Sequence, residues 1–198
     1  MNKMLRVSAA AALAIALGGC ALLGGGPKPP PWLLTLEPSA PAPAAIARSA
    51  NAGEAVTIEV PVVPKELRTT RVPAQVGETA VAYIKDLQWV DTPDRLFQDL
   101  LEETVTRTTN RVVLDKNQST LDPGLTVSGR LSSFGYEAGQ GTVLVQYDAA
   151  LSTGGGTRVE TRRFEARAPA DGTATTVGPA LNTAANQVAL QVAQWIGG

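Results

Sequence analysis

Cys20 is the only cysteine in the chain, and its surroundings in the sequence point to covalent modification of its thiol. It follows a basic start and an apolar run at residues 7–17, with Gly18 and Gly19 directly before it. A basic start, a short apolar segment and small residues form a secretory signal peptide, because small side chains let a peptidase reach the backbone. The pattern predicts that residues 1–19 are a signal peptide and that Cys20 begins the processed chain.

The segment Leu17-Gly18-Gly19-Cys20 resembles the lipobox of bacterial lipoproteins. The resemblance implies a diacylglyceryl group on the Cys20 thiol and an acyl group on its new amino terminus. Several acyl chains anchor a protein stably, since each buried methylene contributes about 0.8 kcal/mol. Ala21 stands where an aspartate often marks retention at the inner membrane. The resemblance therefore implies anchoring to the outer membrane, on its periplasmic face.

Two other interpretations of this region are weaker. A membrane-spanning helix needs about 20 apolar residues, and the run at 7–17 is much shorter. A buried structural cysteine needs neighbours that can pack, whereas Cys20 is followed closely by glycines and prolines.

The chain contains no histidine, and Cys20 is assigned to a lipid. These two facts exclude Ser-His and Cys-His nucleophile pairs and remove the usual ligands of zinc. Gly154-Gly155-Gly156 lacks the Lys and Ser or Thr of a phosphate-binding loop and is predicted to be a hairpin turn. Three carboxylates, Asp99, Glu102 and Glu103, are interpreted as a solvated helix face rather than an acid–base site. The sequence thus predicts no catalytic residue, no metal site, no cofactor apart from the lipid, and no enzyme activity.

Composition indicates one exported domain. The chain has 17 basic and 18 acidic residues, and loss of Lys3 and Arg6 with the signal peptide makes it slightly more acidic. Nucleic-acid binding needs a basic surface, so no nucleic acid is expected as a partner. A length of 198 residues with 44% hydrophobic composition fits a single domain with its own core.

A stretch rich in proline, glycine and alanine follows the predicted anchor, and such a composition forms an extended tether. The sequence assigns residues 20–51 to this tether and residues 52–198 to the domain. Within the tether, the apolar residues 32–36 have two interpretations. They form either the first strand of the domain or a segment that docks on a partner.

Period-two alternation predicts the strands. Residues 56–62 form the first, with Val60 and Val62 on its buried face, and Pro61 and Pro64 confine it to a sheet edge or end it. Two short strands are expected around Gly77. Further strands are predicted at 112–114, 125–136, 142–151 and 158–168. The apolar phase slips between Leu131 and Phe134 and between Val159 and Phe164, which predicts a bulge at each place.

Two helices are predicted. Thr92 can cap the first, and Pro93 suits its first position. Its apolar stripe consists of Leu96, Phe97, Leu100, Leu101 and Val105. The second helix runs from Val177 to Trp195 and ends at Gly197. These elements predict a single α+β domain in which a mixed or antiparallel sheet packs with two main helices. If both helices cover one face, apolar positions remain on the other and need a partner.

In this order, the features resemble the ABC-type transport auxiliary lipoproteins, a family that includes PqiC. The features that carry the resemblance are Cys20, Trp32-Leu33-Leu34, residues 60–67, Arg71-Val72, residues 87–91 and the Ala-rich last helix. Two features depart from the family pattern. Trp32 replaces a tyrosine, and Thr69-Thr70 stands near the place of an aspartate–arginine pair.

The resemblance implies a fold similar to the amino-terminal domain of TolB. It also implies a non-catalytic outer-membrane lipoprotein subunit of an MCE/ABC-type lipid transport system, which docks the periplasmic MCE component. Expected partners are an MCE-domain protein, an ABC permease and ATPase, and further copies of the chain in a ring. The alternative is a structural or regulatory lipoprotein of an exporter or envelope-assembly complex.

Overall fold

The computed structural model describes residues 30–42, 47–122, 124–153 and 158–197. The chain divides into two compact units, Met1–Pro31 and Trp32–Gly198, and the elements below belong to the second. Cys20, the predicted signal peptide and the predicted turn at 154–156 lie outside the described residues. In the part of the chain that the structure describes, no helix has both the length and the hydrophobicity needed to cross a bilayer.

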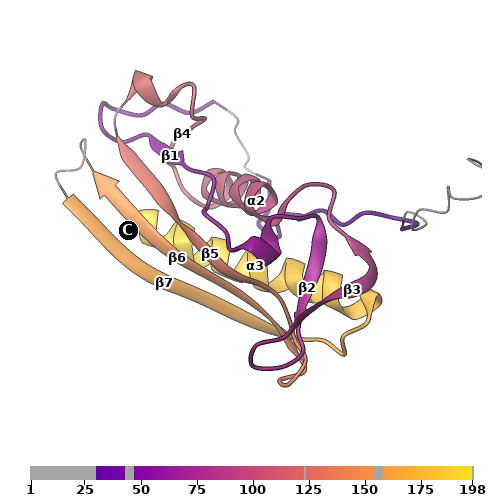
Figure 1. Ribbon diagram of the computed structural model, residues 1–198. Coiled ribbons are helices and arrows are strands. Elements are labelled where there is room, and N and C mark those ends of the chain that lie inside the picture. Colours follow the sequence, from indigo (N-terminus) through magenta and orange to yellow (C-terminus); the bar gives the residue numbers. More distant parts are fainter. Residues whose placement is uncertain (1–29, 43–46, 123, 154–157, 198) are drawn as a thin grey trace, which may run out of the picture. The chain divides into compact units, whose positions relative to one another are not determined.

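A seven-stranded mixed sheet is organised around the long strand β5 (Leu125–Glu137) (Figure 1). On one edge of β5, β6 (Thr142–Thr153) and β7 (Arg158–Pro169) follow as antiparallel neighbours. The other edge is shared by two short parallel strands, β1 (Val56–Ile58) near the start of β5 and β2 (Arg71–Gln75) near its end. Strand β4 (Val113–Leu114) pairs with β1, and β3 (Val81–Gln88) pairs with β2.

Prolines explain why two short strands share one edge of β5. Pro61 and Pro64 cannot donate to a ladder, so strand β1 ends at Ile58. A single bridge then joins Val62 to Arg130, and the short 3-10 helix η1 (Lys65–Leu67) follows it. A second 3-10 helix, η2 (Ser119–Leu121), lies between β4 and β5. After the Val62–Arg130 bridge, the chain pairs with β5 again only at β2.

The predicted burial of Val60 and Val62 is wrong. Their side chains are 42% and 58% exposed, whereas all three residues of β1 are buried. Strand β1 is not an edge strand, because β4 and β5 flank it and α2 packs on it. Neighbouring elements therefore bury all three residues of β1. The period-two alternation of buried and exposed side chains does not continue past Pro61, which interrupts the ladder.

The three long strands match the prediction closely, and one of the two predicted bulges is present. The pairing of β5 with β6 shifts between Leu131 and Ser133, as expected. The prediction of a second bulge is wrong, since β6 and β7 pair without a shift, from the Thr142–Pro169 pair to the Thr153–Arg158 pair. Val159 breaks the apolar phase simply because its side chain points to solvent, with 60% exposed.

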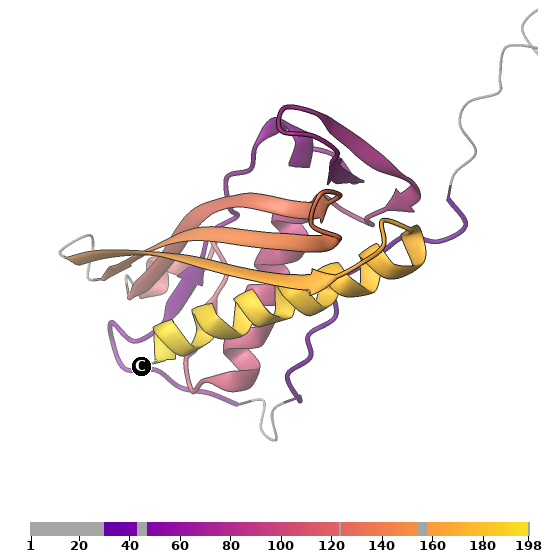
Figure 2. The ribbon, with the colours of Figure 1, turned by 90° about the horizontal axis from the view of Figure 1, so that it is seen from below.

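Helices α2 (Pro93–Thr108) and α3 (Ala174–Gly197) cover the same face of the sheet (Figure 2). Thr92 occupies the N-cap of α2 and Pro93 its first turn, as predicted, although the Thr92 side chain makes no capping bond. The backbone carbonyl of Thr92 accepts hydrogen bonds from the Arg95 and Leu96 amides. The predicted apolar stripe of α2 is entirely buried.

An aromatic cluster joins α2 to the sheet. The ring centroid of Phe97 lies 6.4 Å from that of Phe134 on β5 and 5.3 Å from that of Tyr147 on β6. Trp89, which follows β3, lies 5.5 Å from Phe134. Tilted and edge-on aromatic pairs at these distances stabilise beyond their area burial. The cluster thus connects β3, β5, β6 and α2 in one core.

The face of β5–β7 away from the helices is polar, so the expectation of an apolar second face is wrong. Ser132 Oγ donates to Asp148 at 3.0 Å, and Arg163 bonds the same carboxylate at 2.5 Å. The Arg163 hydrogen bond, with help from Ser132, lowers the pKa of Asp148. Leu144 is the buried apolar residue of this face, and it lines a small cavity of about 170 Å³ beside β2 and β3.

The folded unit begins at Trp32, well before the predicted domain start at residue 52. The predicted strand at 32–36 is reduced to one bridge, in which Leu34 pairs with Trp89. Beyond it the chain lies along α3. Asn182 accepts from the Glu37 amide at 2.9 Å, and Asn186 accepts from the Ser39 amide at 2.6 Å. More than half of the predicted tether therefore belongs to the compact unit that begins at Trp32.

Candidate functional site

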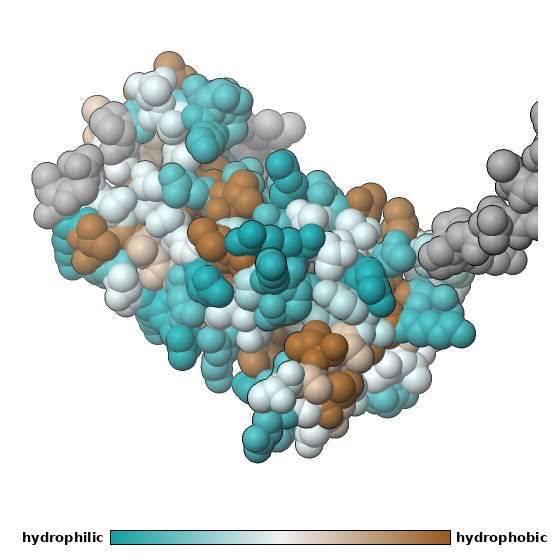
Figure 3. Space-filling model, viewed as in Figure 1, coloured by the Kyte–Doolittle hydropathy of each residue, from teal (hydrophilic) through white to brown (hydrophobic). Residues whose placement is uncertain are grey.

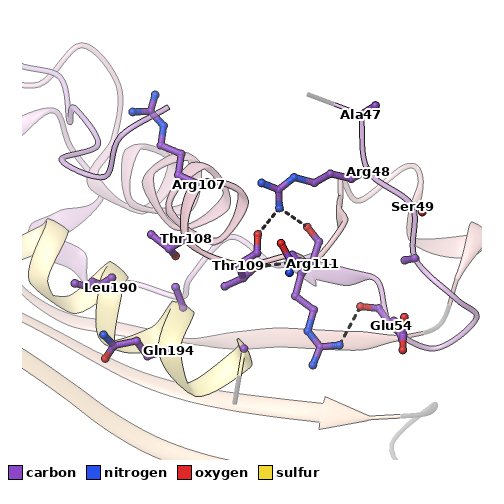
Figure 4. Close-up of a pocket in the computed structure, with 14 residues that line it drawn as sticks. Ala47, Arg48, Ser49, Glu54, Arg107, Thr108, Thr109, Arg111, Leu190 and Gln194 are labelled. Atoms are coloured by element: carbon purple, nitrogen blue, oxygen red, sulfur yellow. Dashed lines mark hydrogen bonds between the residues drawn. The ribbon is translucent and has the colours of Figure 1, made fainter. Parts of the chain in front are cut away.

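A cavity of about 1020 Å³ lies where the carboxyl-terminal ends of α2 and α3 meet residues 47–54 (Figure 4). Its lining comes from three places in the sequence, the segment 47–54, residues 107–111 and the last turns of α3. Arg48, Arg107 and Arg111 contribute three positive charges, and Glu54 contributes one carboxylate. Leu190, 41% exposed, belongs to its apolar wall.

Arg48 is bound to the end of α2. Its guanidinium donates to the carbonyl oxygens of Thr106 and Thr109 and, at 3.3 Å, to that of Arg111. The last carbonyls of a helix lack intrahelical partners and carry a partial negative charge. A guanidinium at this position donates hydrogen bonds to these carbonyls and places a positive charge beside their partial negative charge, so Arg48 caps α2.

Arg111 performs the same task for α3. Its guanidinium donates to the Ile196 carbonyl and to the Glu54 carbonyl, each at 3.3 Å. Arg107 instead bonds Glu103 at 2.6 Å and the Ala40 carbonyl at 2.7 Å, and it points away from the other two arginines in Figure 4. The three guanidinium groups thus join Ala40, Arg48 and Glu54 to the ends of the two helices.

The described side chains that line the cavity supply positive charge and hydrogen-bond donors. The described side chains that line it include no pairing of a nucleophile with a base. Across the described residues, no group of three or more acidic, histidine or cysteine side chains is placed to hold a metal ion. The arginines already bind backbone carbonyls, which gives them a structural role first.

The helix carboxylates do not converge on the cavity. Asp99 is exposed, Glu103 pairs with Arg107, and Glu102 accepts a hydrogen bond from Gln98 at 3.0 Å. Partial burial, followed by the charge of Asp99, raises the pKa of Glu102. Although the Asp99 side chain is largely exposed, partial desolvation, followed by the charge of Asp91, likewise raises the pKa of Asp99. Their interpretation as surface positions of α2 agrees with this geometry.

Sequence reasoning missed Arg48 and Arg111 as functional positions. Arg48 lies in a segment assigned to the tether, and Arg111 follows the end of a helix. The one usable signal was the Arg111 position itself, since basic residues are favoured near helix ends. Nothing local predicts that Arg48 reaches a helix about sixty positions away.

The family model for the ABC-type transport auxiliary lipoprotein component matches residues 34–193. The chain belongs to this family. The match starts at Leu34, the residue that bridges Trp89, so the family domain includes the docked segment and ends within α3.

Solved structures share the fold at low sequence identity. The crystal structure of an uncharacterized protein superposes with a TM-score of 0.60 at 15% identity, covering 76% of this chain and 96% of that one. The protein XCC0632 from Xanthomonas campestris gives a TM-score of 0.63 at 16% identity, covering 86% of this chain and 94% of that one. A PelC dodecamer from Paraburkholderia phytofirmans reaches only 0.45 at 14% identity, too low to support an argument. The search of curated proteins gave no match.

These findings confirm the predicted family and the single-domain α+β fold. Membership gives the chain an accessory role in ABC-type transport, as a membrane-associated lipoprotein rather than a member of a known enzyme family. An ABC transporter is accordingly its partner class.

Proposed function

We propose that this protein is a non-catalytic outer-membrane lipoprotein subunit of an MCE/ABC-type intermembrane lipid transport system, and that it docks the periplasmic MCE component. The observation that carries the proposal is the family match over residues 34–193. Cys20 carries the diacylglyceryl and amino-terminal acyl groups in this proposal.

The early start of the domain limits its reach. Only residues 21–31 separate Cys20 from the compact unit that begins at Trp32. An extended chain spans at most about 3.3–3.6 Å per residue, so this tether reaches about 40 Å. The domain therefore stays close to the bilayer, and the MCE component has to extend to it.

Affinity capture from membranes tests the proposal. Full-length protein is compared with Cys20→Ala, which retains the whole folded unit and removes the thiol that carries the anchor. We expect the acylated wild type to recover an MCE protein and ABC subunits, and the variant to recover markedly less. If acylated wild type recovers neither class, the proposal is contradicted.

The ring assembly stays a prediction. Native mass of the full chain in detergent, measured with and without a purified MCE partner, tests it. A closed oligomer that shifts to a larger complex supports docking. A monomer that ignores the partner counts against it.

A further inference from the structure

We propose that Trp32, Leu33 and Val90 form a bilayer-contact patch, which rests in the headgroup region of the membrane to which Cys20 is anchored. This inference rests on the proposed lipid anchor and adds a second point of attachment to it. These three residues are called the anchor-side patch.

The anchor-side patch is exposed although it is apolar. Trp32 is 55% exposed, Leu33 is 52% exposed and Val90 is 55% exposed. Leu34 donates to the Gln88 carbonyl at 2.8 Å and accepts from the Val90 amide at 2.8 Å, so the segment lies beside the end of β3. Side chains alternate along such extended pairs. With Leu34 and Trp89 on the inner side, Leu33 and Val90 both lie on the outer side, diagonally across the bridge, and Trp32 is exposed at the bend that precedes it.

The patch cannot turn inward, because the inner positions are already filled. Trp89 is 1% exposed and Leu36 is 8% exposed. Leu34 lies against α3 at Gly178, where a Cβ would come within 3.0 Å of the leucine side chain. Asn186 holds the following backbone by bonds to Glu37 and Ser39. The patch is thus presented to solvent by a firmly docked segment.

Chain length favours the bilayer as the occupant. Trp32 is the first residue of the folded unit, and twelve positions in sequence separate it from Cys20. The tether confines this end of the domain to within about 40 Å of the acyl chains. Figure 3 shows apolar side chains as small separate areas on the face that it displays.

The residue types suit the interface rather than the bilayer core. Tryptophan is enriched at the headgroup level of membranes, where its ring meets both apolar and polar surroundings. Asp91 follows Val90, is exposed and accepts a hydrogen bond from the Thr92 amide at 2.6 Å. A carboxylate at the rim of the patch opposes deep burial. The expected contact is therefore shallow.

Bilayer contact at this patch leaves the arginine-lined cavity free. Helix α3 passes Leu34 at Gly178 and reaches the cavity at Gly197. At 1.5 Å per residue, this part of the helix is about 30 Å long. The patch and the cavity therefore lie at opposite ends of α3.

Brominated-lipid quenching of tryptophan emission tests the proposal on the full-length acylated protein. The protein is placed in vesicles of phosphatidylethanolamine and phosphatidylglycerol that contain brominated lipid. The difference between wild type and Trp32→Phe isolates the Trp32 signal, since Trp89 is buried and Trp195 is half-buried. We expect quenching and a blue shift of the Trp32 emission.

A matched pair of variants locates the contact. Leu33→Asp places a carboxylate in the anchor-side patch and should reduce the quenching of Trp32. Val159→Asp makes a comparable change at another exposed apolar position, on β7, and should leave it unchanged. Equal effects of the two variants would contradict the proposal, as would unquenched Trp32 in a wild type shown by intact mass to be acylated.

The outcomes also separate this inference from the lipid anchor. Absence of the acyl mass on Cys20 overturns the anchor itself. A present acyl mass, with Trp32 unquenched by lipid but shielded from a water-soluble quencher on addition of the MCE protein, overturns the bilayer contact and assigns the patch to a protein partner.

Discussion

At the scale of single residues, the core contains polar atoms that have no hydrogen-bond partner. Tyr147 is fully buried on β6, and among the described residues neither its hydroxyl nor the indole nitrogen of buried Trp89 has a partner. Buried polar groups are normally paired, and an unpaired one loses its bonds to water without compensation. Packing of the two rings therefore outweighs the cost of their polar atoms.

Removal of the Tyr147 hydroxyl should not destabilise the protein. In Tyr147→Phe we expect an unchanged free energy of unfolding, or one raised by about 1 kcal/mol, because the ring stays and the unpaired group goes. Tyr147→Ala should lose about 3–5 kcal/mol through the cavity it leaves. Urea denaturation measures both. A clear loss in the phenylalanine variant would indicate a partner for the hydroxyl.

Tyr147 also predicts that the stability of the protein depends on pH in the alkaline range. Burial, with a smaller effect of the Glu59 charge, raises the pKa of Tyr147 far above its ordinary value of 10. The unfolded chain then ionises first, so stability present below pH 10 is lost as the pH rises further. Tyr147→Phe should lose less stability than wild type from pH 10 upward. Identical slopes for the two proteins would contradict the burial argument.

Gly129 is required by the close approach of β5 and β6. A Cβ at this position would lie 2.4 Å from the Asp148 carbonyl oxygen and 2.8 Å from the Tyr147 ring. We expect Gly129→Ala to cost at least about 2 kcal/mol, since backbone must move. Gly139→Ala meets no atom within 4 Å and should change stability by less than about 0.5 kcal/mol. Thermal unfolding of the two variants checks the contrast.

At the scale of elements, α3 holds the amino-terminal segment through two asparagines. Asn186 accepts from Ser39 and donates to the carbonyls of Glu37 and Asn182, while Asn182 accepts from the Glu37 amide. Amide side chains pair well with extended backbone because each offers a donor and an acceptor. This pairing converts a proline-rich sequence into part of the domain.

Asn186→Ala should release this segment. We expect the free energy of unfolding to fall by about 2 kcal/mol, because the hydrogen bonds of a largely buried side chain are lost. Hydrogen exchange of the Ser39 amide should accelerate most, whereas the Glu37 amide keeps Asn182 as its partner. Gln187→Ala, an exposed neighbour on α3, serves as the control and should alter neither amide. Unchanged exchange at Ser39 in the Asn186 variant would rule out this attachment.

At the scale of the whole molecule, the domain belongs to a family of transport accessory lipoproteins, and we expect residues ahead of the folded unit to determine its location. Ala21 follows the predicted anchor, where an aspartate would favour the inner membrane. We expect Ala21→Asp to move the protein from outer to inner membrane fractions on a density gradient. Ala21→Ser should stay with the outer membrane. Wild type in the inner membrane fraction would refute the proposed location.

Much of the fold follows from local patterns in the sequence. The stripe of α2, Pro93 at its start and the alternation in β5–β7 all predict the observed elements, because period 3.6 and period two reflect one buried side. The bulge near Leu131 was also predictable from a shift of that phase. The failure at Val159 has the same origin, since an exposed valine looks like a buried one in sequence.

The sequence by itself determined the class of the protein: its family resemblance, its α+β elements and the candidate anchor at Cys20. Only the tertiary structure decided that both helices share one face, that β5 pairs with two short strands, and that residues 34–39 dock on α3. The bonds from Asn182 and Asn186 join residues about 150 positions apart, as Arg48 joins the end of α2 across about 60. Local periodicity carries no information about such contacts, because they depend on which surfaces the packed helices bring together.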